Sequence, residues 1–146
     1  MAWYEDVDTT KAFRLGHRQK DVAGNEYVYL AGVASNAEGE WLVWDESYAT
    51  TRLVADEVGP VGVSMSYFDA TTDYGWAQIW GKNTVAKTDT VAADKGLYID
   101  GTTGRADDAG VAGDWITGAF SMTADTSNVA TVWLNYPSVS DGAYLT

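Results

Sequence analysis

Cysteine is absent from the 146-residue chain. Its absence excludes disulfide bonds, thiolate catalysis, cysteine-based zinc sites and cysteine-ligated iron–sulfur clusters. Histidine occurs once, at His17, in a segment that also holds Arg14, Arg18 and Lys20. Because no nucleophile motif accompanies it, no catalytic triad is predicted, and we expect His17 at the surface or at a strand end. Walker and Gly-x-Gly-x-x-Gly motifs are also missing, and no cofactor or metal is expected.

Long apolar runs and basic residues are scarce as well. No run reaches the roughly 18–20 apolar residues of a membrane span, and the first residues lack the basic-then-apolar pattern of a secretory signal. Nine Lys and Arg stand against 21 Asp and Glu, a net charge of −12. Such a surface repels phosphate backbones and anionic lipids, so neither nucleic acid nor a membrane is an expected partner. The charge fits a protein held at high local density in a cytoplasm-like setting, or one that docks onto a basic surface.

Aromatic, β-branched and glycine residues are what the chain has in abundance. Hydrophobic residues make up 46% of it and aromatic residues 13%, enough for one domain with a core. Short β-rich segments alternate with turn signals, at residues 13–18, 26–33, 40–45, 61–66, 74–80, 84–87, 97–100, 115–122 and 129–136. Residues 91–95 fit either a short helix or a loop. The pattern predicts an all-β fold with a single antiparallel β-sandwich or barrel.

Residues 1–12 show neither strand nor helix periodicity and are predicted to form an extended N-terminal arm, followed by a single β domain at 13–146. Trp3 and Tyr4 lie in this arm. Large aromatic side chains have no folding role in a free tail but make strong anchors in a partner's groove. We therefore predict that Trp3 and Tyr4 dock onto a neighbouring subunit or another protein; the alternative is that the arm folds back as an edge strand.

The middle and the last third of the chain follow the same order of segments, at about residues 39–81 and 95–136. In each, an apolar strand ending in Asp precedes an apolar-x-Gly strand with Ser and Met, and then a strand containing aromatic residues. The offset of roughly 55 residues lies where internal repeats are worth testing. A pseudo-twofold repeat would make Gly62 equivalent to Gly118, Trp44 to Ile99, and Ile79 to Trp133. The alternative is chance similarity among short β sequences.

Several of these segments resemble a family of small virion proteins of tailed bacteriophages. They are Glu26–Leu30, the Gly-Pro-Val-Gly-Val at 59–63, Tyr74–Gly81, Leu97-Tyr98, Thr103–Asp108 and Val132–Pro137. In sequence they are similar to head decoration, or cement, proteins from about residue 25 onward. The resemblance implies a many-copy protein on the outside of an icosahedral capsid, often trimeric, that holds neighbouring coat subunits together.

Paired carboxylates are the remaining candidates for chemistry. They occur at Asp45/Glu46, Asp56/Glu57, Asp107/Asp108 and Asp6-x-Asp8. Glycosidases use two carboxylates and calcium sites use clusters of them. Adjacent residues of a strand point to opposite faces, however, so we interpret these pairs as turn or edge residues.

The tryptophans allow two interpretations. In the segment 74–80, Trp76, Gln78 and Trp80 share one face by alternation, and Ala77 and Ile79 share the other. Exposed tryptophans can stack on sugar rings, whereas buried ones serve a core or an interface. We predict that Trp76 and Trp80 lie in a core or at a partner interface.

Taken with the resemblance, these features predict a non-enzymatic capsid decoration (cement) protein on the outer surface of the virion, assembled in the host cytoplasm. Its expected partners are the major capsid (coat) protein and further copies of itself, in a homotrimer. The alternative is a carbohydrate-binding or receptor-adhesion domain on the virion surface. A small glycoside-active enzyme with a carboxylate pair is a third possibility.

Overall fold

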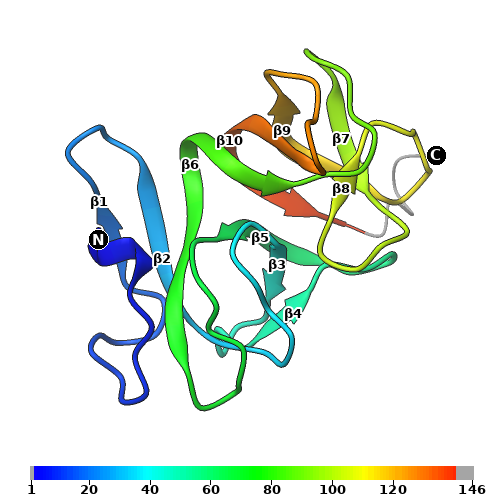
Figure 1. The fold of residues 1–146 in the computed structure, drawn as a ribbon. Coiled ribbons are helices and arrows are strands. Elements are labelled where there is room, and N and C mark those ends of the chain that lie inside the picture. Colours follow the sequence, from blue (N-terminus) through cyan, green and yellow to red (C-terminus); the bar gives the residue numbers. More distant parts are fainter. Residues whose placement is uncertain (1, 141–146) are drawn as a thin grey trace.

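A computed structural model describes residues 2–140 (Figure 1); Met1 and residues 141–146, assigned above to the arm and the end of the domain, lie outside the described residues. The described part is built of strands that pair antiparallel in one sheet, with a single 3-10 turn, η1 (Trp3–Glu5). The strands are β1 (Arg18–Lys20), β2 (Glu26–Ala31), β3 (Trp41–Trp44), β4 (Thr50–Arg52), β5 (Gly59–Ser64), β6 (Tyr74–Lys87), β7 (Gly96–Ile99), β8 (Ala106–Asp107), β9 (Trp115–Ser121) and β10 (Val129–Val139). The prediction of an all-β antiparallel fold is confirmed.

The strand order along the sheet is β1-β2-β6-β5-β10-β9-β7-β8, with β3 joined to β5 and β4 to β3. Strand β6 connects the two halves: its first part pairs with β2 and β5, and its second part pairs with β10. Figure 1 shows β6 running through the middle of the molecule and turning at its far end towards β10 and β9. The turn passes Gly81, whose φ of +102° favours glycine. A Cβ at Gly81 would also overlap Oδ1 of Asn25.

Two groups of four strands have the same order and direction. In the N-terminal unit (β3, β4, β5, β6), β4 pairs with β3, β3 with β5 and β5 with β6. In the C-terminal unit (β7, β8, β9, β10), β8 pairs with β7, β7 with β9 and β9 with β10. A common strand order is what the repeat hypothesis requires.

One of the predicted residue equivalences does not follow the register. Val63 pairs with Gln78 in the N-terminal unit, and Ala119 pairs with Leu134 in the C-terminal unit. If Gly62 is equivalent to Gly118, then Val63 is equivalent to Ala119, and their partners Gln78 and Leu134 are equivalent too. Ile79 is then equivalent to Asn135, so the predicted equivalence of Ile79 with Trp133 is wrong by two residues. Trp44 and Ile99 hold the same place in their hairpins, as the last paired residues before the turn, but they are buried in different clusters.

The main core lies between the two units. It is apolar and takes side chains from β3, β5, β7, β9, β10 and the end of β6, among them Trp41, Val63, Leu97, Ile116 and Leu134. Since each unit contributes one face, neither unit could bury this surface alone.

Two smaller clusters cover the rest of the N-terminal unit. Leu42, Trp44, Ala77 and Ile79 are buried with Phe68, which comes from the connection between β5 and β6. Phe68 lies over Gly75, where a Cβ would overlap its ring. The N-terminal unit is therefore buried on both of its faces.

The second cluster is aromatic and includes the N-terminal segment. The Trp3 ring lies 4.9 Å from Trp76 and 5.4 Å from Tyr27, and Tyr4 stacks on Tyr27 at 4.5 Å. Asp8 pairs with Tyr74 across a β-bridge. The segment thus folds back onto its own domain, through a 3-10 turn and one bridge rather than a full edge strand. The prediction that Trp3 and Tyr4 dock onto a neighbour is corrected, because their rings already pack against their own chain.

Candidate functional site

Within residues 2–140, the C-terminal unit is covered on one face only. Strand β9 alternates between buried residues such as Ile116 and exposed ones such as Trp115 and Phe120, which are 43% and 44% exposed. Phe120 pairs directly with Trp133 of β10, so both lie on the same side of the sheet. Aromatic side chains therefore line the side that points away from the main core.

Three rings extend this surface towards the bend of β6. Trp80 lies 5.6 Å from Trp133 in an edge-to-face arrangement and 5.4 Å from Tyr136. The guanidinium of Arg18 lies 5.8 Å from the centre of the Tyr136 ring. We call the surface of Trp80, Trp115, Phe120, Trp133 and Tyr136 the aromatic face. Tryptophan, tyrosine and arginine are the residue types that most often dominate binding energy at protein interfaces.

Tyr136 has an unusual backbone. Its φ is +46°, a left-handed conformation that costs a non-glycine residue about 1–3 kcal/mol. At this point β10 changes partner: Asn135 pairs with Trp80 of β6, and Ser138 pairs with Pro60 of β5. The change of partner therefore places an exposed tyrosine at the junction of the two units.

Polar contacts hold Tyr136 in place. Its hydroxyl donates a hydrogen bond of 2.8 Å to Oε1 of Glu26, and Arg18 approaches the other carboxylate oxygen at 3.8 Å. The bond to Glu26 raises the pKa of Tyr136. The ring is thereby held in one position by contacts within its own chain.

A β-bulge separates Trp76 from Trp80. Glu26 pairs with Trp80 while Tyr27 pairs with Gln78, so Ile79 is an extra residue in β6. The extra residue takes Trp80 out of the predicted alternation with Trp76 and Gln78. Trp76 is 1% exposed inside the aromatic cluster, so it is a core residue with no surface for a partner. Trp80 is half-buried and belongs to the aromatic face.

Acidic residues are missing from the strands that form this face. Strands β6, β9 and β10 contain no Asp or Glu, in a chain that has 21 of them, and their charged residues are Lys82 and Lys87. Depletion of charge around exposed aromatic side chains is typical of the centre of a protein interface.

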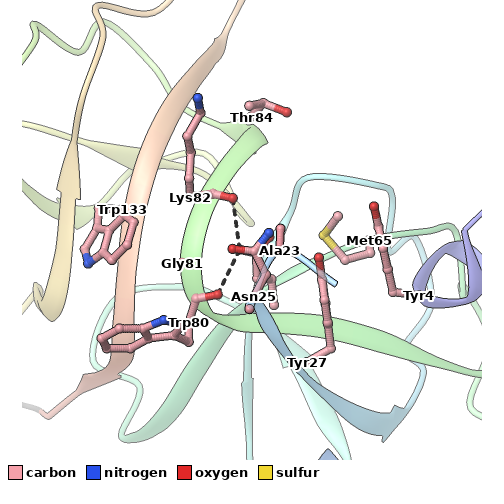
Figure 2. Close-up of a pocket in the computed structure, with 12 residues that line it drawn as sticks. Tyr4, Ala23, Asn25, Tyr27, Met65, Trp80, Gly81, Lys82, Thr84 and Trp133 are labelled. Carbon is pink, nitrogen blue, oxygen red and sulfur yellow. Dashed lines mark hydrogen bonds between the residues drawn. The ribbon is translucent and has the colours of Figure 1, made fainter. Parts of the chain in front are cut away.

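A hollow of about 490 Å³ lies at the bend of β6, next to the aromatic face (Figure 2). Trp80 and Trp133 lie on one side of the bend, and Tyr27, Met65 and Tyr4 lie on the other. The buried amide of Gln78 donates to the carbonyl oxygens of Trp80 and Lys82, both at 3.0 Å. Its polar group is thus already used within the chain, and the aromatic side chains do not converge on one ligand position.

A second hollow, of about 360 Å³, lies on the aromatic face itself. Trp115, Phe120 and Trp133 line it together with Gly96, Gly118, Ala119 and Asn135. The exposed rings of this hollow offer a surface on which a ligand could stack, and Asn135 offers a hydrogen-bonding group.

The paired carboxylates lie in turns and at edges, with Asp45 directly before a turn, Asp107 in the edge strand β8 and Asp8 in a β-bridge. Asp45 accepts hydrogen bonds from the backbone N–H groups of Ser47 and Ala49, and Asp107 accepts one from Ala109. Asp8 accepts a 2.7 Å bond from the Tyr29 hydroxyl. Within residues 2–140, no three His, Asp or Glu side chains form a group that could hold a metal ion.

His17 stacks on Phe13 at 5.1 Å and lies 3.3 Å from the Gln19 amide oxygen, directly before β1. Its place next to a strand end agrees with the sequence analysis. Over the same described range, no helix has the length and apolar character needed to cross a membrane.

The sequence analysis identified Trp80 but missed Trp133, Tyr136, Trp115, Phe120 and Arg18 as members of one surface. One signal for this surface was present in the sequence. Between residues 115 and 140 the only acidic residue is Asp125. The pairing that joins these segments to Trp80 depends on the bend of β6, which no local pattern encodes.

No protein-family model matches the chain, and comparisons with curated proteins and with solved structures found no match. The resemblance to head decoration proteins thus stays a prediction based on the quoted motifs.

Proposed function

We propose that this protein is a non-enzymatic decoration (cement) protein of a phage head that docks onto the coat protein through its aromatic face. The observation that carries the proposal is the preformed cluster of Trp80, Trp133, Tyr136 and Arg18, whose three rings come from strands without Asp or Glu in a strongly acidic chain. Together with Trp115 and Phe120, this face has the composition of an interface centre.

The geometry of the rings favours a protein over a flat sugar surface. Trp80 and Trp133 are inclined at 72° to each other, and Trp80 and Tyr136 at 33°. A flat row of sugar rings stacks best on coplanar aromatic rings, and the inclined rings of this face do not offer such a platform. The remaining surface carries most of the negative charge and would point to solvent, where it keeps particles apart.

Stabilisation of the head follows from mass action. A protein that binds the assembled lattice and not the free coat subunit stabilises the lattice by its binding free energy at every occupied site. The strained and hydrogen-bonded Tyr136 supports this role, since a preorganised anchor loses little entropy on docking.

The test is occupancy of expanded heads that lack the protein, at limiting protein concentration. We expect Phe120→Ser to reduce occupancy about tenfold or more, because it removes an exposed aromatic side chain from the centre of the face. The matched control is Tyr67→Ser, which removes an aromatic side chain that is 62% exposed on the loop after β5. Equal occupancy of the two variants would count against docking through this face.

We also propose self-association, as a homotrimer, through the part of the face that the coat leaves free. Light scattering of the pure protein and of protein released from particles measures it. A monomer in both samples would remove this part of the proposal.

The alternative function, carbohydrate binding or receptor adhesion, is favoured by the hollow between Trp115 and Trp133 with the Asn135 amide at its edge. A glycan array separates it from decoration. Saturable binding to one class of glycan, lost in the Trp115→Ala variant, would favour adhesion. An array with no binding, together with normal occupancy of heads, would favour decoration.

A further inference from the structure

A groove runs along the side of the molecule from the aromatic face towards the β3–β4 turn. It consists of two adjoining hollows, of about 410 and 540 Å³, which share Arg18, Trp44, Val58, Gly59 and Pro60. Because both hollows share these residues, an extended chain could pass from one into the other.

One end of the groove is apolar. Its floor and walls include Trp44, Val61, Ile79 and Pro137, and Val58 stands 63% exposed at the rim. An exposed valine beside buried apolar residues leaves apolar area that contact with an apolar side chain would remove from water.

The other end is acidic. Asp45 and Glu46 line it, and both are exposed. One oxygen of Asp45 accepts bonds from the backbone of the turn, at 2.9 Å and 3.2 Å, which holds the carboxylate at the groove. Asp56 and Glu57 directly precede Val58 in the chain. Asp45 and Glu46 thus place negative charge at this end of the groove.

Arg18 lies between the two ends, but its charge is opposed by Glu26 at 3.8 Å, and it also approaches the Tyr136 ring. Tyr136 lines the apolar hollow and belongs to the aromatic face. The groove is therefore continuous with the proposed docking surface.

We propose that this groove binds an extended segment of a protein partner in which an apolar side chain is followed by a basic one. The apolar side chain packs between Val58 and Pro60, and the basic side chain meets Asp45 and Glu46. The inference rests on the proposed function in one respect, that the partner is a protein, and it adds the chemistry of the segment that is recognised.

The test uses the free protein and short fluorescein-labelled peptides in which valine alternates with lysine. Fluorescence anisotropy measures their binding. A valine–glutamate peptide and a serine–lysine peptide are the comparison probes. We expect saturable binding of the valine–lysine peptide only, weakened by added salt because the charges involved are exposed.

Two substitutions probe the two ends. Glu46→Lys and Val58→Asp should each weaken binding of the valine–lysine peptide about tenfold. The matched controls are Asp69→Lys and Val22→Asp, at exposed positions away from the groove, which should leave binding unchanged. All four variants keep the melting temperature of the parent if they fold normally, which circular dichroism checks.

No saturable binding of the valine–lysine peptide, or equal affinity for the valine–glutamate peptide, would overturn the inference. So would equal effects of the groove variants and their controls. If head occupancy depends on Phe120 while the peptide fails to bind, the proposed function stands and the groove inference falls. If the peptide binds as expected while Phe120→Ser keeps full occupancy of the heads, the groove inference stands and the proposed docking through the aromatic face falls.

Discussion

The N-terminal and C-terminal units share a strand order but differ in what covers them. All four residues of β3 are buried, whereas β9 alternates between buried and exposed residues. In the N-terminal unit, Phe68 covers one face and the N-terminal segment covers part of the other. The C-terminal unit has no such cover on its aromatic face within the described residues. The comparison teaches that one unit is covered on both faces by its own chain, while the other leaves an apolar face uncovered within the described residues, where we propose that a partner binds.

The largest expected effect tests this difference with two phenylalanines. Phe68→Ala removes a fully buried ring and should lower the free energy of unfolding by about 3–5 kcal/mol. Phe120→Ala, on the aromatic face, should change it by about 0.5 kcal/mol or less. Chemical denaturation of both variants measures the contrast. Similar losses in the two would mean that the aromatic face belongs to the fold rather than to binding.

The hairpins of the two units provide the next test. In the N-terminal unit, Arg52 donates two hydrogen bonds to the buried Glu40, at 2.6 and 2.8 Å, which raises the pKa of Arg52. Arg52→Ala would leave a buried carboxylate without its partner and should cost about 3 kcal/mol in unfolding free energy. Lys95→Ala, an exposed lysine beside β7, should cost almost nothing. A small loss for Arg52→Ala would show that Glu40 finds water or another donor.

The N-terminal segment should contribute less than either of these. Trp3→Ala removes a half-buried ring that packs on Trp76 and Tyr27, and about 2 kcal/mol of unfolding free energy should be lost. Trp115→Ala is its counterpart on the C-terminal unit and should cost less than half of that, because nothing in the described chain covers it to the same extent. Thermal unfolding ranks the pair, and the reverse order would contradict the assignment of covered and uncovered faces.

The smallest effect concerns the hairpin of the C-terminal unit, which holds two interacting carboxyl groups, whereas the hairpin of the N-terminal unit holds an ion pair. Burial and the hydrogen bond to Asp100 raise the pKa of Asp107 to about 7. Burial alone would raise the pKa of Asp100 too, but hydrogen bonds from Asp107, Thr102 and Gly101 outweigh it and lower that pKa. Of these two neighbouring carboxyl groups, Asp107 is thus the one whose protonated form the fold favours.

Because the folded pKa of Asp107 lies above its ordinary value, its contribution to stability is complete below about pH 4 and is lost as the pH rises through about 7. Asp107→Asn should flatten the decline in melting temperature between about pH 4 and about pH 7. Asp69→Asn, at an exposed site, is the control and should leave the decline as it is. A decline that persists unchanged in Asp107→Asn would rule out this carboxyl pair as its source.

Local patterns predicted the strand content and the shared sequence of segments in the two units, because alternation and turn residues are short-range signals. They failed where pairing shifts by one residue. The bulge at Ile79 separates Trp80 from Trp76, and the backbone of Tyr136 moves β10 from one partner to another. Trp3 and Tyr4 were assigned to a partner because their own partners, Tyr27 and Trp76, are distant in sequence and meet them only in the fold.

Carbene footprinting of the protein on purified heads, compared with the free protein, tests the central claim most directly. Labelling is read at single residues by mass spectrometry. The account predicts strong protection of Trp115, Phe120, Trp133 and Tyr136 on the particle, with the exposed Tyr67 and Val22 labelled equally in both states. Protection of Tyr67 and Val22, with the aromatic face labelled as in the free protein, would contradict it.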